Sequence, residues 1–157
     1  MLLLDADLRR GSQAGLLGTR PDPGLAEALL GQVSVETAIQ RGQSESLYLL
    51  PSGRKVQDPG ELMTGSKLQH ILQQLRPAFD WIVIDTPPVI HFADAGVIAN
   101  MCDGIVMVVG AGITPVALVK RAHREIKKYP ILGVVLNRMK QDAEASKYLG
   151  YYERNEN

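Results

Sequence analysis

The chain has 157 residues, of which 45% are apolar and 22% are charged, as expected for a soluble globular domain with a sizeable core. Its 17 basic residues balance its 17 acidic residues, so the charge gives no reason to expect nucleic acid or an anionic membrane as the main partner. The single cysteine, Cys102, excludes an internal disulfide framework and fits a reducing cytoplasm. The longest apolar run, residues 104–113, is too short to span a bilayer.

Apolar patterns and turn residues predict strands that alternate with helices along the chain. In chain order we expect a strand at 1–4, a short helix around 16–17, helices at 25–30 and 35–40, a strand at 47–50, a loop at 57–60, a helix at 66–76, a strand at 80–84, a helix at 92–101, a strand at 105–109, a helix at 115–128 and a strand at 131–136. The helix at 66–76 is the clearest, because Leu68, Ile71, Leu72 and Leu75 recur on one face.

Several of the expected strands are apolar at every position, which is typical of a parallel sheet with helices on both faces. The predicted fold class is therefore α/β. Ligands bind beyond the carboxyl ends of the strands in such a sheet. Asp5, Asp7, Ser52, Asp85 and Asn137 all follow expected strands, so we expect these side chains at the ligand-binding edge.

Two carboxylates one residue apart, Asp5 and Asp7, follow the first strand. Such a pair is typical of a site that holds Mg²⁺ through water, or of a base that accepts a proton from an attacking hydroxyl. A solvated loop explains the pair equally well. Arg9 and Arg10 come next, and guanidinium groups beside acids suit a phosphate site, although surface charge is the alternative interpretation.

The stretch WIVIDTPP, residues 81–88, is more specific. Four apolar residues followed by an aspartate form a Walker B pattern, in which the strand fixes the acid and the acid reaches Mg²⁺ through water. The alternative is a strand that ends in a helix-capping aspartate. Pro87 and Pro88 weaken this alternative, because they do not open a regular helix cleanly. We therefore expect Asp85 to be a functional residue.

Two further features allow two interpretations each. Asn137 follows the last strand, where its amide is able to hydrogen-bond an adenine edge or simply to end the strand. Tyr148, Tyr151 and Tyr152 lie within five residues of one another in a polar segment. They indicate either a site of phosphorylation, which would add nearly two negative charges, or a short helix that packs its tyrosines.

Taken together, these motifs resemble those of the bacterial tyrosine kinases (BY-kinases). MLLLDADLRR resembles the Walker A′ motif, D-x-D-x-R after apolar residues, with matches at Asp5, Asp7 and Arg9. WIVIDTPP resembles the Walker B motif, matched at Asp85. LYLLPSG with DPGELM, GVVLNRM and YLGYY are similar to the family's PSG segment, its last strand and its C-terminal tyrosine cluster. The resemblance covers nearly the whole chain.

The resemblance implies a P-loop NTPase fold of the deviant Walker type shared with MinD and ParA. It implies an enzyme that uses ATP and Mg²⁺ to phosphorylate its own tyrosines, at Tyr148, Tyr151 and Tyr152, between the subunits of a ring-forming homo-oligomer. BY-kinases regulate capsular polysaccharide or exopolysaccharide synthesis and export. The implied partners are a membrane chain-length regulator and a tyrosine phosphatase, with no nucleic acid, and the implied location is the cytoplasmic face of the plasma membrane.

The resemblance also implies a role for each matching residue. Asp5 would be the base that accepts the proton of the tyrosine hydroxyl, and Arg9 completes the Walker A′ motif. Asp7 and Asp85 would hold Mg²⁺ through water, and Asn137 would contact adenine.

One motif of the family is absent. No G-x-x-x-x-G-K-[ST] sequence, the Walker A motif that cradles phosphates with backbone N–H groups, occurs in the 157 residues. We therefore expect residues 1–140 to form a partial kinase domain without its first strand, P-loop and following helix, and residues 141–157 to form a flexible tyrosine-rich tail. On this interpretation the chain alone is inactive or nearly so. The alternatives are a ParA/MinD-type partitioning ATPase and a non-catalytic interaction module of a polysaccharide-export machinery.

Overall fold

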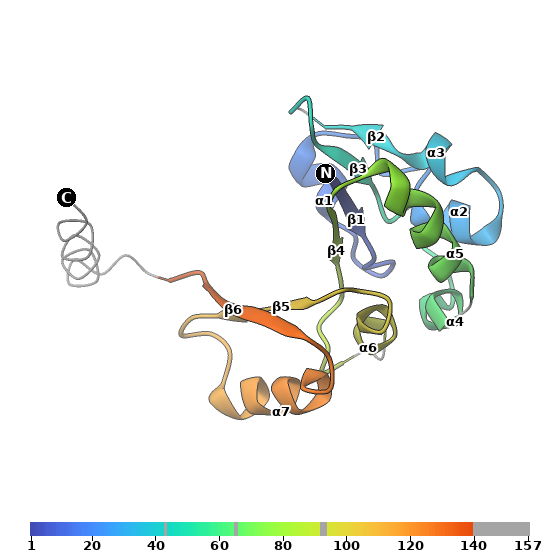
Figure 1. The fold of residues 1–157 in the computed structure, drawn as a ribbon. Helices are drawn as coiled ribbons and strands as arrows, with labels where there is room; N and C mark the ends of the chain where they lie inside the picture. The colour runs from blue at the N-terminus through green and yellow to red at the C-terminus, as the bar shows by residue number, and fades with distance from the viewer. Residues whose placement is uncertain (43, 65, 92–93, 140–157) are drawn as a thin grey trace. The chain divides into compact units, whose positions relative to one another are not determined.

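A computed structural model describes residues 1–42, 44–64, 66–91 and 94–139 of the chain. The chain divides into two compact units between Cys102 and Asp103, and Figure 1 labels their elements. The first unit contains β1 (Leu2–Asp5), α1 (Gln13–Leu17), α2 (Leu25–Leu30), α3 (Val35–Ala38), β2 (Gln40–Arg41), β3 (Tyr48–Leu50), α4 (Pro59–Thr64), α5 (Ser66–Leu75), the 3-10 helix η1 (Arg76–Ala78), β4 (Ile82–Asp85) and α6 (Asp94–Ala99). The second unit contains β5 (Ile105–Gly110), α7 (Val116–Ile126) and β6 (Ile131–Asn137).

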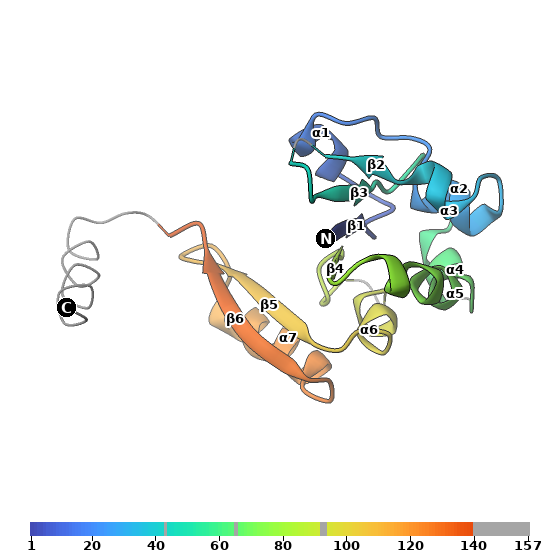
Figure 2. The ribbon, with the colours of Figure 1, turned by 45° about the horizontal axis from the view of Figure 1, so that its top comes forward.

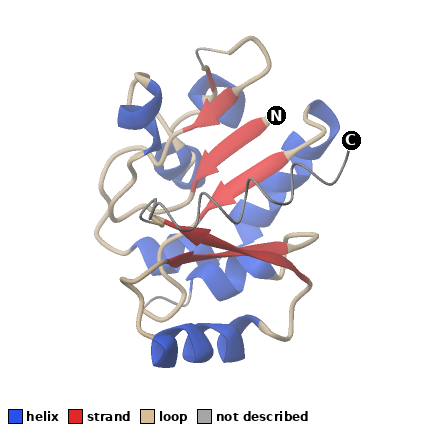
Figure 3. Ribbon diagram, turned by 90° about the vertical axis from the view of Figure 1, so that its left-hand side faces the viewer, coloured by secondary structure: helices blue, strands red, loops and turns tan. Residues whose placement is uncertain are grey.

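The sheet of the first unit has the strand order β2-β3-β1-β4. Strands β3, β1 and β4 are parallel, and Figure 3 shows them side by side and pointing the same way. The register places Asp5 directly opposite Asp85, so the parallel pairing brings the two predicted acids to one edge. Strand β2 pairs antiparallel with β3. The sequence did not indicate β2, because a strand of two residues carries no readable period.

The core of the first unit lies between this sheet and the helices α2, α3, α4 and α5, which gather on one side of it (Figures 1 and 2). Leu2 and Leu4 point from β1 into this core because alternate residues of a strand share a face. Helix α5 buries the predicted apolar stripe, Leu68, Ile71, Leu72 and Leu75. The opposite face is less covered, since Val83 of β4 is exposed there.

The segment after β3 is tied to the start of α2 by a buried carboxylate. Glu27 accepts hydrogen bonds from the backbone N–H of Gly24 at 2.7 Å and of Arg54 at 3.0 Å. The first of these bonds belongs to a capping box at the start of α2. Backbone bonds from Leu25 and Ala26 to the carbonyls of residues 51 and 52 complete the junction. The PSG turn is thereby fixed next to the carboxyl ends of the strands.

Every predicted strand is present, whereas two local predictions are wrong. The expectation of a loop at 57–60 fails because α4 begins at Pro59. Asp58 accepts a hydrogen bond from the N–H of Glu61, as an N-cap residue does, and proline is favoured at the first helical position. The helix expected at 35–40 ends at Ala38, because the chain turns into β2 at Gln40.

In the second unit, α7 connects the parallel strands β5 and β6 and buries Ala122 and Ile126. Val106 and Val108 of β5 are exposed, so the described helices do not cover both faces of either sheet completely. The predicted α/β fold class is nevertheless confirmed by the parallel strands and their helical connections. None of the described helices is long and apolar enough to cross a membrane.

Candidate active site

Two carboxylates, Asp5 and Asp85, stand side by side where β1 and β4 end. Asp5 is 1% exposed, and both of its oxygens accept backbone hydrogen bonds. The N–H of Asp7 donates to Oδ1 at 3.2 Å, and the N–H of Gln13 donates to Oδ2 at 3.1 Å. Asp5 is therefore held rigidly by its own loop, whereas Asp85 is only half-buried.

The surroundings of Asp5 raise the pKa of its carboxyl group. Burial raises the pKa of Asp5 above its ordinary value, and the neighbouring charge of Asp85 acts in the same direction. The hydrogen bonds from the backbone N–H groups of Gln13 and Asp7 oppose this rise in pKa without cancelling it. A carboxylate that takes up a proton more readily than usual suits the predicted role of a base.

Gln13 links the two acids, a role that no sequence pattern predicts. Its backbone N–H contacts Asp5, and its side-chain amide Nε2 donates to Asp85 Oδ2 at 2.6 Å. The residue type carries no motif. Gln13 is the first residue of α1, directly after the N-cap residue Ser12, where the loop that follows β1 ends. Only the fold shows that this first helical residue spans both strand ends.

The side chains of Asp7 and Arg9 make further contacts around the acid pair. Asp7 Oδ1 accepts hydrogen bonds from the backbone N–H of Arg9 at 3.1 Å and of Arg10 at 3.0 Å, so this oxygen closes the turn of its own loop. The guanidinium of Arg9 forms an ion pair with Asp94 at the start of α6. The side chain of Asp94 is 4% exposed. Arg9 thus joins the loop after β1 to the helix that follows β4.

The loop after β1 also packs closely on the PSG turn. A Cβ atom at Gly11 would lie 1.8 Å from Ser52 Oγ and 3.0 Å from Asp5 Oδ2. Only glycine fits here without displacing Ser52, because real Cβ contacts are essentially never shorter than 3.0 Å. Ser52 is therefore part of the site's wall, as its position after β3 predicts.

The other predicted site residues belong to the second unit or follow it in the sequence. Asn137 ends β6 in the second unit, where its Oδ1 accepts the N–H of Arg138 at 2.7 Å. Its carbonyl accepts the N–H of Ala111 at 2.7 Å. Tyr148, Tyr151 and Tyr152 lie outside the described residues. The adenine contact and the phosphorylation sites stay predictions.

The strand end at Asp85 fits a hydrated magnesium ion. Among the described residues, no three His, Cys, Asp or Glu side chains form a cluster that could hold a metal ion by themselves. Mg²⁺ keeps several of its waters, however, and is usually bound by one or two carboxylates together with substrate phosphates. Asp85 supplies a hard oxygen donor of this kind, and Asp7, the second predicted ligand, lies in the loop that follows its neighbour Asp5.

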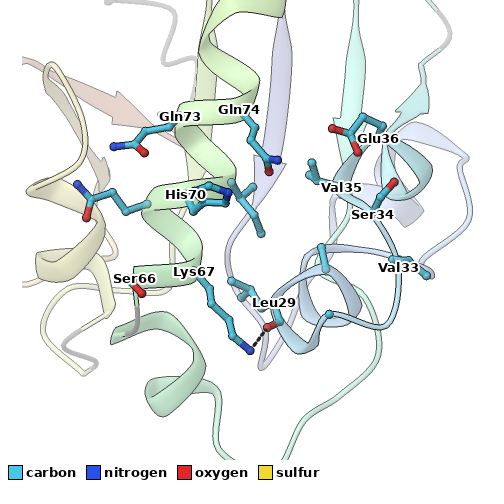
Figure 4. A pocket seen from close by; sticks show the side chains of 14 residues that line it. Leu29, Val33, Ser34, Val35, Glu36, Ser66, Lys67, His70, Gln73 and Gln74 are labelled. Atoms are coloured by element: carbon cyan, nitrogen blue, oxygen red, sulfur yellow. Dashed lines mark hydrogen bonds between the residues drawn. The ribbon is translucent and has the colours of Figure 1, made fainter.

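A separate pocket of about 550 Å³ lies between α5 and the segment that contains α2 and α3 (Figure 4). Lys67 Nζ donates to the carbonyl of Leu29 at 2.9 Å on one side, and Glu36 reaches in from α3 (Figure 4). None of the predicted site residues lines this pocket. It is therefore not part of the candidate active site.

No protein-family model matches the chain. It is 31% identical over 159 residues to the tyrosine-protein kinase YwqD of Bacillus subtilis, covering 100% of this chain and 66% of YwqD. It is 32% identical over 154 residues to the putative tyrosine-protein kinase CapB of Staphylococcus aureus, covering 97% of this chain and 68% of CapB. The chain belongs to the bacterial tyrosine-protein kinase family. It spans about two thirds of these two kinases and 19% of a third relative, the succinoglycan biosynthesis transport protein ExoP of Rhizobium meliloti, to which it is 33% identical.

Solved structures agree with this family assignment. The BY-kinase fold of the VpsO kinase domain matches with a TM-score of 0.83 and 32% identity, covering 88% of this chain and 70% of VpsO. The chimerical protein CapA2B2 matches with a TM-score of 0.85 and 30% identity, covering 89% of this chain and 63% of the other. The cell division ATPase MinD of Pyrococcus furiosus matches with a TM-score of 0.71 and 28% identity, covering 94% and 65%. The predicted P-loop NTPase fold of the MinD/ParA type is thereby confirmed.

Proposed function

We propose that this BY-kinase chain forms part of an ATP-dependent protein-tyrosine autokinase that regulates capsular polysaccharide or exopolysaccharide synthesis and export. The observation that carries the proposal is the pairing of Asp5 with Asp85 at the carboxyl ends of neighbouring parallel strands. The pair lies in a chain whose relatives are named tyrosine-protein kinases, and one relative is named for succinoglycan biosynthesis and transport.

Asp5 and Asp85 have different roles in the proposed mechanism. Asp5 is buried and has a raised pKa, so it serves as the base that takes the proton of the tyrosine hydroxyl. Asp85 is half-buried and, together with Asp7, would hold Mg²⁺ through water. The bound ion would neutralise charge on the ATP phosphates. Asn137 contacts the adenine.

Arg9 acts in this proposal by holding the acids in place. Its ion pair with Asp94 fixes the loop that carries Asp5 and Asp7 against the helix that follows Asp85. Because phosphoryl transfer depends mainly on positioning and charge stabilisation, a small displacement of this loop would slow the reaction. Arg10, which is exposed, is the guanidinium left to face phosphate.

The phosphate acceptors in the proposal are Tyr148, Tyr151 and Tyr152. A second copy of the chain within a ring presents them to the site, and a tyrosine phosphatase reverses the modification. The protein works with a membrane chain-length regulator at the cytoplasmic face of the membrane. Support for these partners comes from the family, including the CapA2B2 chimera, and from the ExoP relative.

The experiment that tests the proposal supplies the missing phosphate cradle. The chain contains no Walker A motif, so the 157 residues alone should show no transfer from labelled MgATP. A fusion that places a segment with the family's Walker A motif before Met1 should label its own tyrosines, and replacing Tyr148, Tyr151 and Tyr152 by Phe should abolish the labelling. An unlabelled but folded fusion would contradict the proposed function. Robust labelling of the 157-residue chain alone would contradict the claim that transfer needs the Walker A segment.

The MinD likeness supports one alternative, a partitioning ATPase. The same fusion distinguishes the two functions. Steady release of inorganic phosphate with no phosphotyrosine would indicate an ATPase of that class, whereas phosphate found on tyrosine indicates a kinase. A fusion that neither hydrolyses ATP nor labels itself would favour a non-catalytic interaction module.

A further inference from the structure

Gln13 places two hydrogen-bond donors between the paired acids. Its backbone N–H donates to Asp5 Oδ2 at 3.1 Å, and its amide Nε2 donates to Asp85 Oδ2 at 2.6 Å. Among the described residues, the Gln13 amide is the only side chain that donates to Asp85. One residue therefore bridges the carboxylate of the proposed base and that of a proposed Mg²⁺ ligand.

The two donors differ in how easily they move. The backbone N–H belongs to the first residue of α1, so it cannot leave Asp5 unless that turn of helix unwinds. The side-chain amide is free to swing away by rotation about its own bonds. Asp5 and Asp85 lie directly opposite each other on adjacent strands, so two charged carboxylates repel each other there when no cation is near. A donor on Asp85 reduces this repulsion in the cation-free protein.

We propose that Gln13 is a positioning residue that competes with the hydrated divalent cation for Asp85 Oδ2. Its amide holds the Asp85 carboxylate in place while the site is free of cation, and it is displaced when a metal-bound water donates to the same oxygen. In this proposal the amide, at 2.6 Å from Oδ2, occupies the position that the metal-bound water would take, so the two donors exclude each other. The inference rests on the proposed role of Asp85 in holding Mg²⁺.

This competition has a definite thermodynamic consequence. A hydrogen bond that stabilises only the cation-free form makes cation binding less favourable by the free energy of that bond. Removing the bond must therefore tighten cation binding. For a hydrogen bond to a charged group, we expect its removal to raise cation affinity about tenfold. A residue that merely scaffolds the site would have the opposite effect, because its loss would disorder Asp85 and weaken binding.

The test uses the full 157-residue chain with Mn²⁺ as the probe, followed by electron paramagnetic resonance. Gln13→Met keeps the length of the side chain and removes the donor, and we expect it to bind Mn²⁺ about tenfold more tightly than the unmodified chain. Gln13→Asn keeps an amide that is too short to reach Asp85, so it should also tighten binding. Gln57→Met, in an exposed loop, is the matched control and should change nothing.

A second readout follows the amide itself. In the unmodified chain, the NMR signals of the Gln13 side-chain NH₂ should shift when Mg²⁺ is added, and this shift should be absent in Asp85→Asn. If Asp85→Asn abolishes Mn²⁺ binding but both Gln13 variants weaken it, Gln13 is a scaffold and only this inference fails. If Asp85→Asn leaves Mn²⁺ binding unchanged, the proposed role of Asp85 fails and the competition fails with it.

Discussion

Replacing Arg9 by Met should destabilise the first unit strongly, because it leaves the Asp94 carboxylate buried without its cation. The side chain of Asp94 is 4% exposed and that of Arg9 is 25% exposed, so the ion pair is largely shielded from solvent. Removing one partner of a buried pair lowers the free energy of unfolding by about 3–5 kcal/mol. Because Arg9 is partly exposed, we expect a loss at the lower end of this range, about 3 kcal/mol. Methionine keeps most of the apolar stem, so lost packing contributes little.

The assay is urea unfolding followed by circular dichroism, with a double-mutant cycle. The variant Arg9→Met/Asp94→Leu removes both charges and should recover most of the lost stability, since no buried charge is left unpaired. Arg54→Met is the matched control: Arg54 pairs with Asp22 at 2.9 Å, but its side chain is 77% exposed. We expect no measurable change there. A loss in Arg9→Met no larger than in Arg54→Met would refute the reasoning.

Three further predictions concern the segment from the end of β1 to α1. Gly11→Ala should destabilise the chain by about 1–3 kcal/mol in urea unfolding, because its Cβ would collide with Ser52, whereas Gly15→Ala should stabilise it by about 0.5–1 kcal/mol, because that helical glycine has open space around it. Burial raises the pKa of Asp5 above its ordinary value of 3.8, so the folded chain holds this proton more tightly than the unfolded chain does. The folded chain therefore loses stability as the pH rises from about 3.8 through the pKa of Asp5 in the folded state. Asp5→Asn should therefore gain stability relative to the unmodified chain between pH 4 and pH 7 in the same assay. An unchanged difference over that range would contradict the pKa argument.

The strands and the acid pair could be predicted from sequence because their signals are local. An apolar run that ends in aspartate specifies both a buried strand and the edge where its carboxylate emerges. Once β1 and β4 are neighbours and parallel, the register must bring Asp5 and Asp85 together. The start of α4 was missed, because the turn-like composition of residues 57–60 obscures the N-terminal capping pattern of Asp58, Pro59 and Glu61.

The partners of these acids were not readable, because they depend on the tertiary fold. Arg9 and Asp94 are 85 residues apart, and no periodicity connects them. Arg9 therefore appears in the sequence as a candidate phosphate ligand or a surface charge, whereas the fold pairs it with a buried acid. Gln13 and Asp85 are 72 residues apart, and a glutamine at the start of a short helix carries no motif. Long-range polar contacts of this kind are set by packing, which a local pattern does not encode.

The most direct test of the proposed site is the rate of tyrosine phosphorylation in the fusion that supplies the Walker A segment. The rate is compared between a variant at the end of β4 and a variant just before β4. Asp85→Asn removes the carboxylate beside Asp5 and should lower the rate by about 10²–10³-fold. Asp80→Asn removes an exposed carboxylate just before the same strand and should leave the rate unchanged. Equal rates in the two variants would contradict the claim that the Asp5–Asp85 edge is the site of phosphoryl transfer.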